Sequence, residues 1–214
     1  MQKLTAKELI GLKNHLTNEL KKALPGKKAH LKMIPASRRG EFEEIRAGIR
    51  SAVLLLLYPN QDSLQTVFIQ RPHYDGYHSG QISLPGGKFD PEDGDLLGTA
   101  LREAKEETYI QKESIEVLGP LSPLYIPPSG FQMTPFLAVA PIRPDFRIDP
   151  TEVEGLIEAD IDLFNDSNLK EKEILLHDGR SIVMPYYDIN GSVIWGATGM
   201  VMSEFSMLAE GFLG

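Results

Sequence analysis

The pattern of apolar and polar positions along the chain predicts alternating strands and helices. Runs of strand length fall at residues 52–58, 64–70, 81–84, 115–121, 133–140 and 152–157, and a hairpin is expected over 173–187 with its turn at 177–180. Apolar residues recur at helical spacing over 5–24, 95–108 and 197–210, and 161–166 fits a short helix. These elements favour the α/β class, with a mixed β-sheet sandwiched between helices in an α/β/α arrangement.

The first fifty residues form a predicted arm outside the sheet. Thr5 and Glu8 have the spacing of a capping box, and four leucines follow at roughly helical intervals before a Pro-Gly pair ends the helix. Residues 27–50 are basic and are expected to be irregular. We therefore expect an N-terminal helix and connecting arm over 1–50, packed against a single domain over 51–214.

Composition narrows the classes of protein. The chain has 214 residues, of which 42% are apolar and 24% charged, and no apolar run approaches the roughly 20 residues that span a bilayer. It has no cysteine, and its first residues lack the apolar stretch of a signal peptide, so we expect a cytoplasmic protein. A net charge of −8 argues against nucleic-acid and membrane partners, and acidic residues could instead recruit a divalent cation. A homodimer stays open.

Three glutamates share one face of the helix predicted over 95–108. An apolar stripe on another face consists of Leu97, Ala100, Leu101 and Ala104. Glu103, Glu106 and Glu107 stand at positions i, i+3 and i+4, where carboxylates repel one another and oppose the helix dipole. A bound cation would remove both penalties, and hard oxygen ligands select magnesium or manganese.

The loop before this helix contains two adjacent glycines, whose backbone is less restricted than that of other residues, close to the carboxylates. Gly86 and Gly87 permit a close approach that other residues deny, so that a carbonyl or an amide can point into the site. The alternative is a solvated, charged helix face behind an ordinary glycine turn. The three glutamates by themselves do not separate these two interpretations.

Together these residues resemble the Nudix box. Gly87 is followed by Arg102-Glu103-Ala104-Lys105-Glu106-Glu107 and Ile110, in the order of that motif. The resemblance implies a Nudix fold in which Glu103, Glu106 and Glu107 hold Mg²⁺ or Mn²⁺ with help from the carbonyl of Gly87. It also implies that Glu103, Glu106 and Arg102 carry catalysis, with Arg102 orienting a carboxylate by a salt bridge. An ordinary surface pair between Arg102 and Glu106 is the alternative.

Two positions depart from that motif. Fourteen residues separate Gly87 from Arg102, one more than in the general box, so the early acidic position falls on Asp93 when counted from Gly87 and on Gly94 when counted from Arg102. Tyr109 stands where the box has glycine, the residue that most readily forms a left-handed helix cap. We therefore expect the turn after the helix to close in another way.

The flanking sequence is similar to the coenzyme A pyrophosphatase branch of the Nudix hydrolases. Arg71, Gly80, Pro85, Gly86 and Gly87 match its extended signature, whereas Ile69, Pro72, Gly76 and Leu84 depart from it; segments 129–135 and 194–198 also resemble this branch. If the arginine that Gly76 replaces meets a substrate phosphate, Arg71 or His78 could supply that contact. A surface-loop role is the alternative for His78. We expect Gly86 to contact the substrate as well, and Phe131 to stack on an adenine.

The sequence therefore predicts a pyrophosphatase that acts on a nucleoside-diphosphate-linked small molecule. The resemblance puts coenzyme A or an acyl-CoA first, with (acyl-)phosphopantetheine and adenosine 3′,5′-bisphosphate as products. The second interpretation is ADP-ribose, a dinucleotide or a nucleoside triphosphate, because the box specifies diphosphate chemistry and not the flanking groups. A Nudix-fold binding or regulatory module without turnover is the third. One of the three glutamates or a loop carboxylate would accept the proton, and Glu152, Glu154 and Glu158 are loop or strand acids that a solvated strand face also explains.

Overall fold

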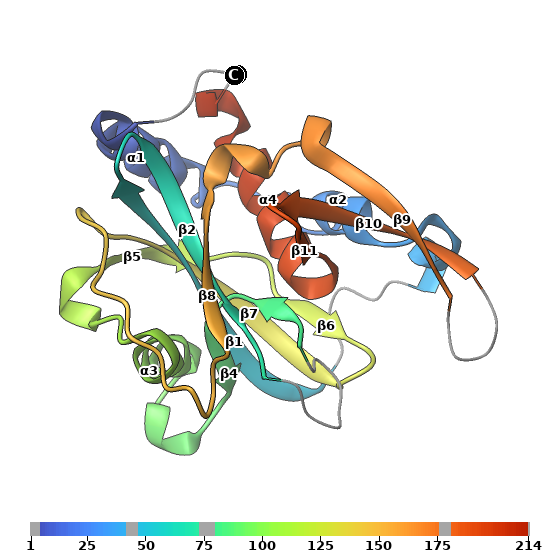
Figure 1. Ribbon diagram of the computed structural model, residues 1–214, viewed down its shortest axis with the longest axis horizontal. Coiled ribbons are helices and arrows are strands. Elements are labelled where there is room, and N and C mark those ends of the chain that lie inside the picture. The colour runs from blue at the N-terminus through green and yellow to red at the C-terminus, as the bar shows by residue number, and fades with distance from the viewer. Residues whose placement is uncertain (1–4, 42–46, 73–79, 176–180, 214) are drawn as a thin grey trace.

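The computed structural model describes residues 5–41, 47–72, 80–175 and 181–213, which form sheets flanked by helices (Figure 1). The strands are β1 Ile49–Asn60, β2 Ser63–Gln70, β3 Ile82–Ser83, β4 Gly86–Lys88, β5 Glu116–Pro120, β6 Leu124–Ile126, β7 Phe131–Val139, β8 Gly155–Asp160, β9 Leu169–Leu175, β10 Ser181–Ile189 and β11 Ser192–Ile194. The α-helices are α1 Leu9–Glu19, α2 Lys27–His30, α3 Leu96–Thr108 and α4 Gly196–Leu213. Short 3₁₀ turns are η1 Ala6–Glu8, η2 Leu31–Met33, η3 Ala36–Glu41, η4 Pro91–Asp93, η5 Lys112–Ser114, η6 Ile161–Leu163 and η7 Asp166–Asn168.

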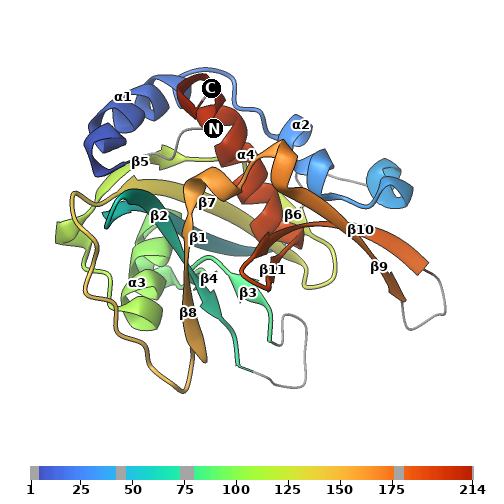
Figure 2. The ribbon, with the colours of Figure 1, turned by 45° about the horizontal axis from the view of Figure 1, so that its top comes forward.

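Strand β1 organises the larger sheet. The strand order is β3-β2-β1-β7-β5, with β4 added to β1, β6 to β7 and β8 to β2. β1 runs parallel to β7 and antiparallel to β2 and β4, so that Ala52 of β1 lies opposite Gly87 of β4. The predicted hairpin of β1 and β2 is confirmed. β9, β10 and β11 form a separate sheet, and Figures 1 and 2 show its β9–β10 hairpin extending away from the larger one.

The two faces of β1 enter different apolar cores. Every residue from Ala52 to Tyr58 is buried, as expected of a strand covered on both sides. Leu55 and Leu57 join the core beneath α1 and α4, whereas Leu54 and Leu56 pack towards α3. Figure 2 shows α3 on one side of the sheet and α1 and α4 on the other. The predicted α/β/α arrangement is confirmed.

The N-terminal arm is more helical than its sequence suggested. The helix expected over 5–24 ends at Glu19, and residues 27–41 form α2, η2 and η3 where an irregular segment was expected. Glu8 reaches back to accept a 2.7 Å hydrogen bond from the backbone N–H of Thr5, as the capping-box spacing predicted. The domain boundary after residue 50 stays a prediction.

Several element boundaries differ from the sequence expectation. β8 begins at Gly155 rather than at residue 152, and the short strands β4, β6 and β11 were not predicted. Leu97 and Leu101, expected to face the core, are only partly buried, while Ala100 and Ala104 are fully buried. The predicted turn at 177–180 lies outside the described residues. Among the helices that the structure describes, none combines the length and the apolarity needed to cross a bilayer.

Candidate active site

Helix α3 begins beside a buried, ionised aspartate. Asp95 caps the helix by accepting a 2.8 Å hydrogen bond from its first turn. Two residues earlier, the side chain of Asp93 is almost wholly buried and accepts hydrogen bonds from Arg102 Nε at 2.6 Å and from Thr99 Oγ1 at 2.7 Å. These bonds, above all that from Arg102, lower the pKa of Asp93 to about 2. Of the two positions that the sequence left open, Asp93 and not Gly94 therefore supplies the carboxylate that binds Arg102.

Arg102 connects Asp93 to the acidic face of α3. Its guanidinium lies 2.9 Å from Glu103 Oε1 and 2.8 Å from Glu106 Oε2, and it donates to the carbonyl of Lys88 at 3.3 Å. The sequence left open whether Arg102 orients a carboxylate or only pairs with Glu106, and both contacts are present. Asp93 therefore fixes a guanidinium that Glu103 and Glu106 share.

Glu107 is the buried member of the three glutamates. Its exposed fraction is 4%; its Oε2 accepts a hydrogen bond from Gly86 N at 2.8 Å, and its Oε1 lies 4.0 Å from Arg71 Nη2. Arg71 itself is held by hydrogen bonds to Ser83 Oγ at 3.2 Å and to the carbonyl of Gly86 at 3.1 Å. Burial raises the pKa of Glu107 to about 7, because the Arg71 charge and the Gly86 N–H offset it only in part.

The carboxylate of Glu103 rests against the backbone of Gly87. A Cβ atom at position 87 would overlap with this carboxylate, and the Glu103 side chain would have to turn away to make room for it. Burial raises the pKa of Glu103; Arg102 opposes this effect, and repulsion from Glu106 adds to it. The Glu106 side chain is 49% exposed. The three glutamates thus run from buried to exposed around one face of the helix.

The oxygen ligands fit a hard divalent cation once two side chains turn. In the described ranges, no group of three histidine, aspartate or glutamate side chains is arranged to hold a metal ion, and Arg102 binds Glu103 and Glu106. Both carboxylates could leave Arg102 without stranding it, since Asp93 accepts hydrogen bonds from two of its nitrogens. A cation beside Glu103 and Glu107 would also relieve the cost of burying them. Carboxylate ligands of this kind suit Mg²⁺ or Mn²⁺.

The exit from α3 differs from the sequence expectation. Tyr109 itself forms the left-handed cap, with φ 63° and ψ 19°, and its N–H donates to the carbonyl of Lys105 at 2.9 Å. The expectation of a different turn was therefore wrong. The guanidinium carbon of Arg147 lies 4.8 Å from the centre of the Tyr109 ring, and the Arg147 N–H donates to the carbonyl of Thr108 at 3.2 Å. Tertiary contacts thus accompany a backbone conformation that is unusual for tyrosine.

A fourth carboxylate approaches from the connection between β7 and β8. Glu152 lies in a turn just before Glu154, whose N–H donates to the carbonyl of Gln70 at 2.9 Å. Burial is the main cause of the raised pKa of Glu103 and of Glu107, and repulsion from the charge of Glu152, which is exposed, adds a smaller contribution to both. The sequence favoured a solvated strand face for Glu152. Its spacing gave no other signal, because contacts between distant segments, among them the pairing of β8 with β2, bring this turn to α3.

The predicted substrate contacts are only partly brought together. Arg71 lies beside Glu107, and both backbone groups of Gly86 are hydrogen bonded within the protein, the N–H to Glu107 and the carbonyl to Arg71. Phe131 begins β7 and pairs with β1 and β6. His78 lies outside the described residues. The roles of these four residues as substrate ligands stay predictions.

Comparison with known proteins gives the family of this arrangement. Residues 48–166 match the model of the NUDIX domain, a range that includes Arg71, α3 and Glu152. A protein named "Uncharacterized Nudix hydrolase NudL" from Yersinia enterocolitica is 39% identical over 133 residues, which are 60% of this chain and 66% of that protein. A NudL protein from Yersinia pestis is 36% identical over 133 residues, 60% of this chain and 64% of its own length. The matched part spans just under two thirds of both relatives.

Solved structures agree on the fold. A MutT/nudix family protein from Enterococcus faecalis superposes with a TM-score of 0.51 and 17% identity, covering 86% of this chain and 73% of that one. RenU, a Nudix hydrolase from M. smegmatis, gives a TM-score of 0.50 and 16% identity, covering 78% of this chain and 88% of its own. At such identities the likeness concerns the fold alone. Nudix hydrolases generally use divalent metal ions, in keeping with the carboxylates of α3. With more than half of its length matching the family model, this chain belongs to the Nudix family.

Proposed function

We propose that this protein is a metal-dependent hydrolase that cleaves the diphosphate bridge of a nucleotide-linked small molecule. The observation that carries the proposal is the burial of Glu107 and the partial burial of Glu103 against Gly86 and Gly87, where the charges of Arg71 and Arg102 offset the cost of burial only in part. Carboxylates in that position suit a cation whose remaining ligands are waters and phosphate oxygens. When bound, Mg²⁺ or Mn²⁺ would neutralise the diphosphate and lower the pKa of a bound water.

The protein groups divide into three roles. Glu103, Glu106 and Glu107 would hold the metal, with help from the carbonyl of Gly87. Arg102 would keep its bonds to Asp93 when two of these glutamates turn to the metal, so that its charge stays beside them. Each turnover adds one water to the diphosphate: an oxygen–phosphorus bond forms, the bridging bond breaks, and the water gives up a proton.

Glu152 is our candidate for the group that accepts this proton. It lies outside α3, in the connection between β7 and β8, and its charge adds to the raised pKa of both Glu103 and Glu107. A carboxylate that is not a metal ligand could take the proton while Glu103, Glu106 and Glu107 keep the metal. Replacement of Glu152 by glutamine should lower kcat at saturating substrate and leave metal binding largely intact. If kcat were unchanged in this variant, one of the α3 glutamates would be the better candidate for the proton acceptor.

Coenzyme A or an acyl-CoA is the substrate that we propose first. The support is the flanking match to the coenzyme A pyrophosphatase branch, together with the position of Arg71, which belongs to that signature and lies 4.0 Å from Glu107. An arginine beside the metal ligands suits a substrate phosphate. The products would be (acyl-)phosphopantetheine and adenosine 3′,5′-bisphosphate.

A substrate panel tests the proposal. Purified protein with Mg²⁺ or Mn²⁺ would be given coenzyme A, an acyl-CoA, ADP-ribose, a dinucleoside polyphosphate and a nucleoside triphosphate, with products identified by mass. We expect the highest kcat/KM for coenzyme A or its thioester. Much faster cleavage of ADP-ribose would favour the second substrate class and keep the hydrolase. No cleavage of any diphosphate would overturn the proposed activity.

A further inference from the structure

The segment that carries Glu152 is attached at both ends beside the proposed active site. We call residues 147–154 the strap. At its start, the N–H of Arg147 donates to the carbonyl of Thr108 at 3.2 Å, and at its end the N–H of Glu154 donates to the carbonyl of Gln70 at 2.9 Å. Thr108 directly follows Glu107, and Gln70 directly precedes Arg71. The strap therefore joins the two sides of the site, as its course past α3 in Figure 1 illustrates.

A compact turn holds Glu152 between these attachments. The Asp149 carboxylate accepts hydrogen bonds from Thr151 N at 2.8 Å and from Thr151 Oγ1 at 2.6 Å, and the Asp149 carbonyl accepts from the N–H groups of Glu152 and Val153 at 3.0 and 2.9 Å. Val153 is completely buried. Because this turn is internally bonded, the position of Glu152 depends on where the strap is attached.

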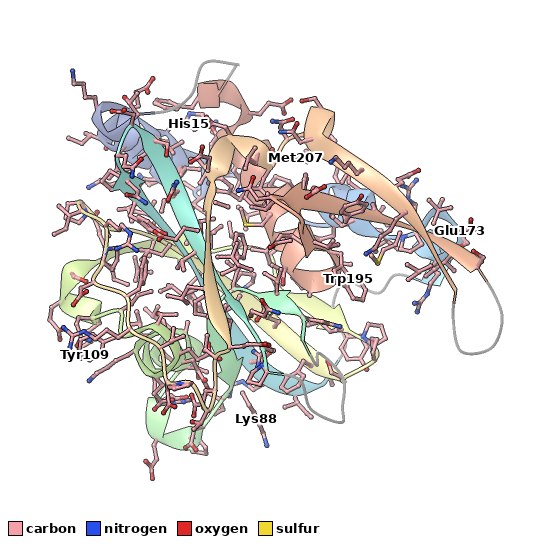
Figure 3. All side chains as sticks on the ribbon, in the orientation of Figure 1. His15, Lys88, Tyr109, Glu173, Trp195 and Met207 are labelled. Atoms are coloured by element: carbon pink, nitrogen blue, oxygen red, sulfur yellow. The ribbon has the colours of Figure 1, made fainter. Side chains whose placement is uncertain are left out.

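Tyr109 reinforces the first attachment from the position where the Nudix box has glycine. Its ring lies 4.8 Å from the Arg147 guanidinium carbon, and its φ of 63° directs the chain out of α3 as a glycine would. Figure 3 shows Tyr109 at the end of α3, next to the connection between β7 and β8. A glycine here would keep the backbone turn and remove the ring on which Arg147 stacks.

We propose that Tyr109 and Arg147 are positioning residues that fix the strap, and with it Glu152, against the catalytic helix. The proposal rests on the proposed function for its effect on turnover. In this proposal the stacking acts only through the strap, and neither side chain is a ligand of the substrate or the metal. Its loss should therefore lower kcat while KM stays nearly constant, and it should free the amides of the strap.

Two substitutions at position 109 separate the ring from the backbone. Tyr109→Gly removes the ring and keeps the left-handed turn, and Tyr109→Phe keeps the ring; Arg147→Ala removes the cation. Since an exposed cation–π contact changes an equilibrium by roughly two- to fivefold, we expect Tyr109→Gly and Arg147→Ala to lower kcat by about that factor, with KM within about twofold. Tyr109→Phe should match the wild type. Hydrogen exchange should accelerate at residues 152–154 in the first two variants only.

A second cation–π pair provides the control. Lys172 lies 5.4 Å from the Tyr186 ring on the smaller sheet, so Lys172→Ala removes a similar contact away from α3 and should change neither readout. Faster exchange with unchanged kcat in Tyr109→Gly would overturn the positioning role, and so would unchanged exchange. If the wild type cleaves no diphosphate, the proposed function fails separately, and exchange alone then decides whether Tyr109 and Arg147 fix the strap.

Discussion

Two glutamates are buried among the described residues, and their surroundings shift the pKa of the two side chains in opposite directions. Glu204 on α4 is completely buried and accepts hydrogen bonds from Gly26 N at 3.0 Å, from Ser122 N and Oγ at 3.2 and 2.6 Å, and from His30 Nε2 at 3.3 Å. Burial acts to raise its pKa, but the bonds from His30 and Ser122 outweigh burial and lower it. Glu107 on α3 has one backbone N–H and a more distant arginine, and its pKa is raised to about 7.

This difference in hydrogen-bond donors distinguishes a structural carboxylate, Glu204, from a carboxylate that suits a bound cation, Glu107. The carboxylate of Glu204 is hydrogen bonded by Gly26 in the arm, by His30 in α2 and by Ser122 in the loop before β6. Glu204 therefore connects these segments to α4. The surroundings of Glu107 leave its charge largely unmet, on the opposite side of the sheet (Figure 2). A buried carboxylate left in this state costs stability without a cation, and that cost is a common property of functional sites.

The largest effect is expected from removing the structural carboxylate. Glu204→Ala leaves the donors of His30, Ser122 and Gly26 buried without their acceptor, so the free energy of unfolding should fall by about 3–5 kcal/mol. Urea denaturation measures it. Glu204→Gln keeps one acceptor oxygen and should lose less. A loss below about 1 kcal/mol for the alanine variant would mean that Glu204 does not hold the arm.

Removing a proposed metal ligand should strongly reduce activity and should not reduce stability, in contrast to the removal of Glu204. Glu107→Gln and Glu103→Gln should reduce kcat/KM for diphosphate hydrolysis by about a hundred- to a thousandfold, because electrostatic groups at the reacting centre contribute on that scale. At pH 8 and in the absence of metal, Glu107→Gln should be at least as stable as the wild type, since it removes a buried charge.

Glu113→Gln is the matched control for that loss, because Glu113 is exposed in η5 and the substitution changes net charge equally. It should leave kcat/KM unchanged. Glu106→Gln tests the third ligand, and unchanged hydrolysis in that variant would refute the assignment of Glu106 to the metal.

The parts of this comparison that the sequence predicted are those with a local pattern. Helix α3, the hairpin of β1 and β2, and the shared face of the three glutamates follow from spacing alone, because periodic burial and capping are properties of neighbouring residues. The family motif then assigned roles to these residues. Asp95 and Asp93 could be located near the helix start for the same reason, although only the structure decided that Asp93 binds Arg102.

The parts that the sequence missed depend on contacts between distant segments. Strand β4 contains two glycines and a lysine and has no apolar pattern, yet it pairs with β1 and lies beneath α3. Glu152 could not be distinguished from other acids, because β8 must first pair with β2. The conformation of Tyr109 could not be predicted from local sequence either. Its left-handed cap is unfavourable for a tyrosine by local propensity, and it occurs together with a tertiary contact to Arg147.

The two buried glutamates should also give opposite pH dependences of stability. Between the usual pKa of 4.5 and about 7, Glu107 keeps its proton in the folded protein and loses it in the unfolded chain. The folded state then binds more protons, so stability falls as pH rises through this window, by up to about 3 kcal/mol. Glu204, with its lowered pKa, stabilises the fold above pH 4.5 and loses that contribution in acid.

Urea denaturation without metal at pH 5 and pH 8 measures these two slopes. The difference in stability between the wild type and Glu107→Gln should change sharply between the two pH values, with the wild type losing more at pH 8. Glu204→Gln should keep the wild-type slope across the same interval. A pH-independent difference for Glu107→Gln would show that burial does not hold a proton on this side chain.

Metal binding gives the last and smallest of these effects. Mn²⁺ at about a hundred times its Kd should stabilise the folded protein by about 2.7 kcal/mol. At one fixed Mn²⁺ concentration, the gain should be larger at pH 8 than at pH 5, because the metal binds the ionised carboxylates of Glu103 and Glu107, whose pKa values are raised. Denaturation curves with and without MnCl₂ measure it. Glu103→Gln should lose most of the gain and Glu204→Gln should keep it; an equal gain in both would place the bound metal away from α3.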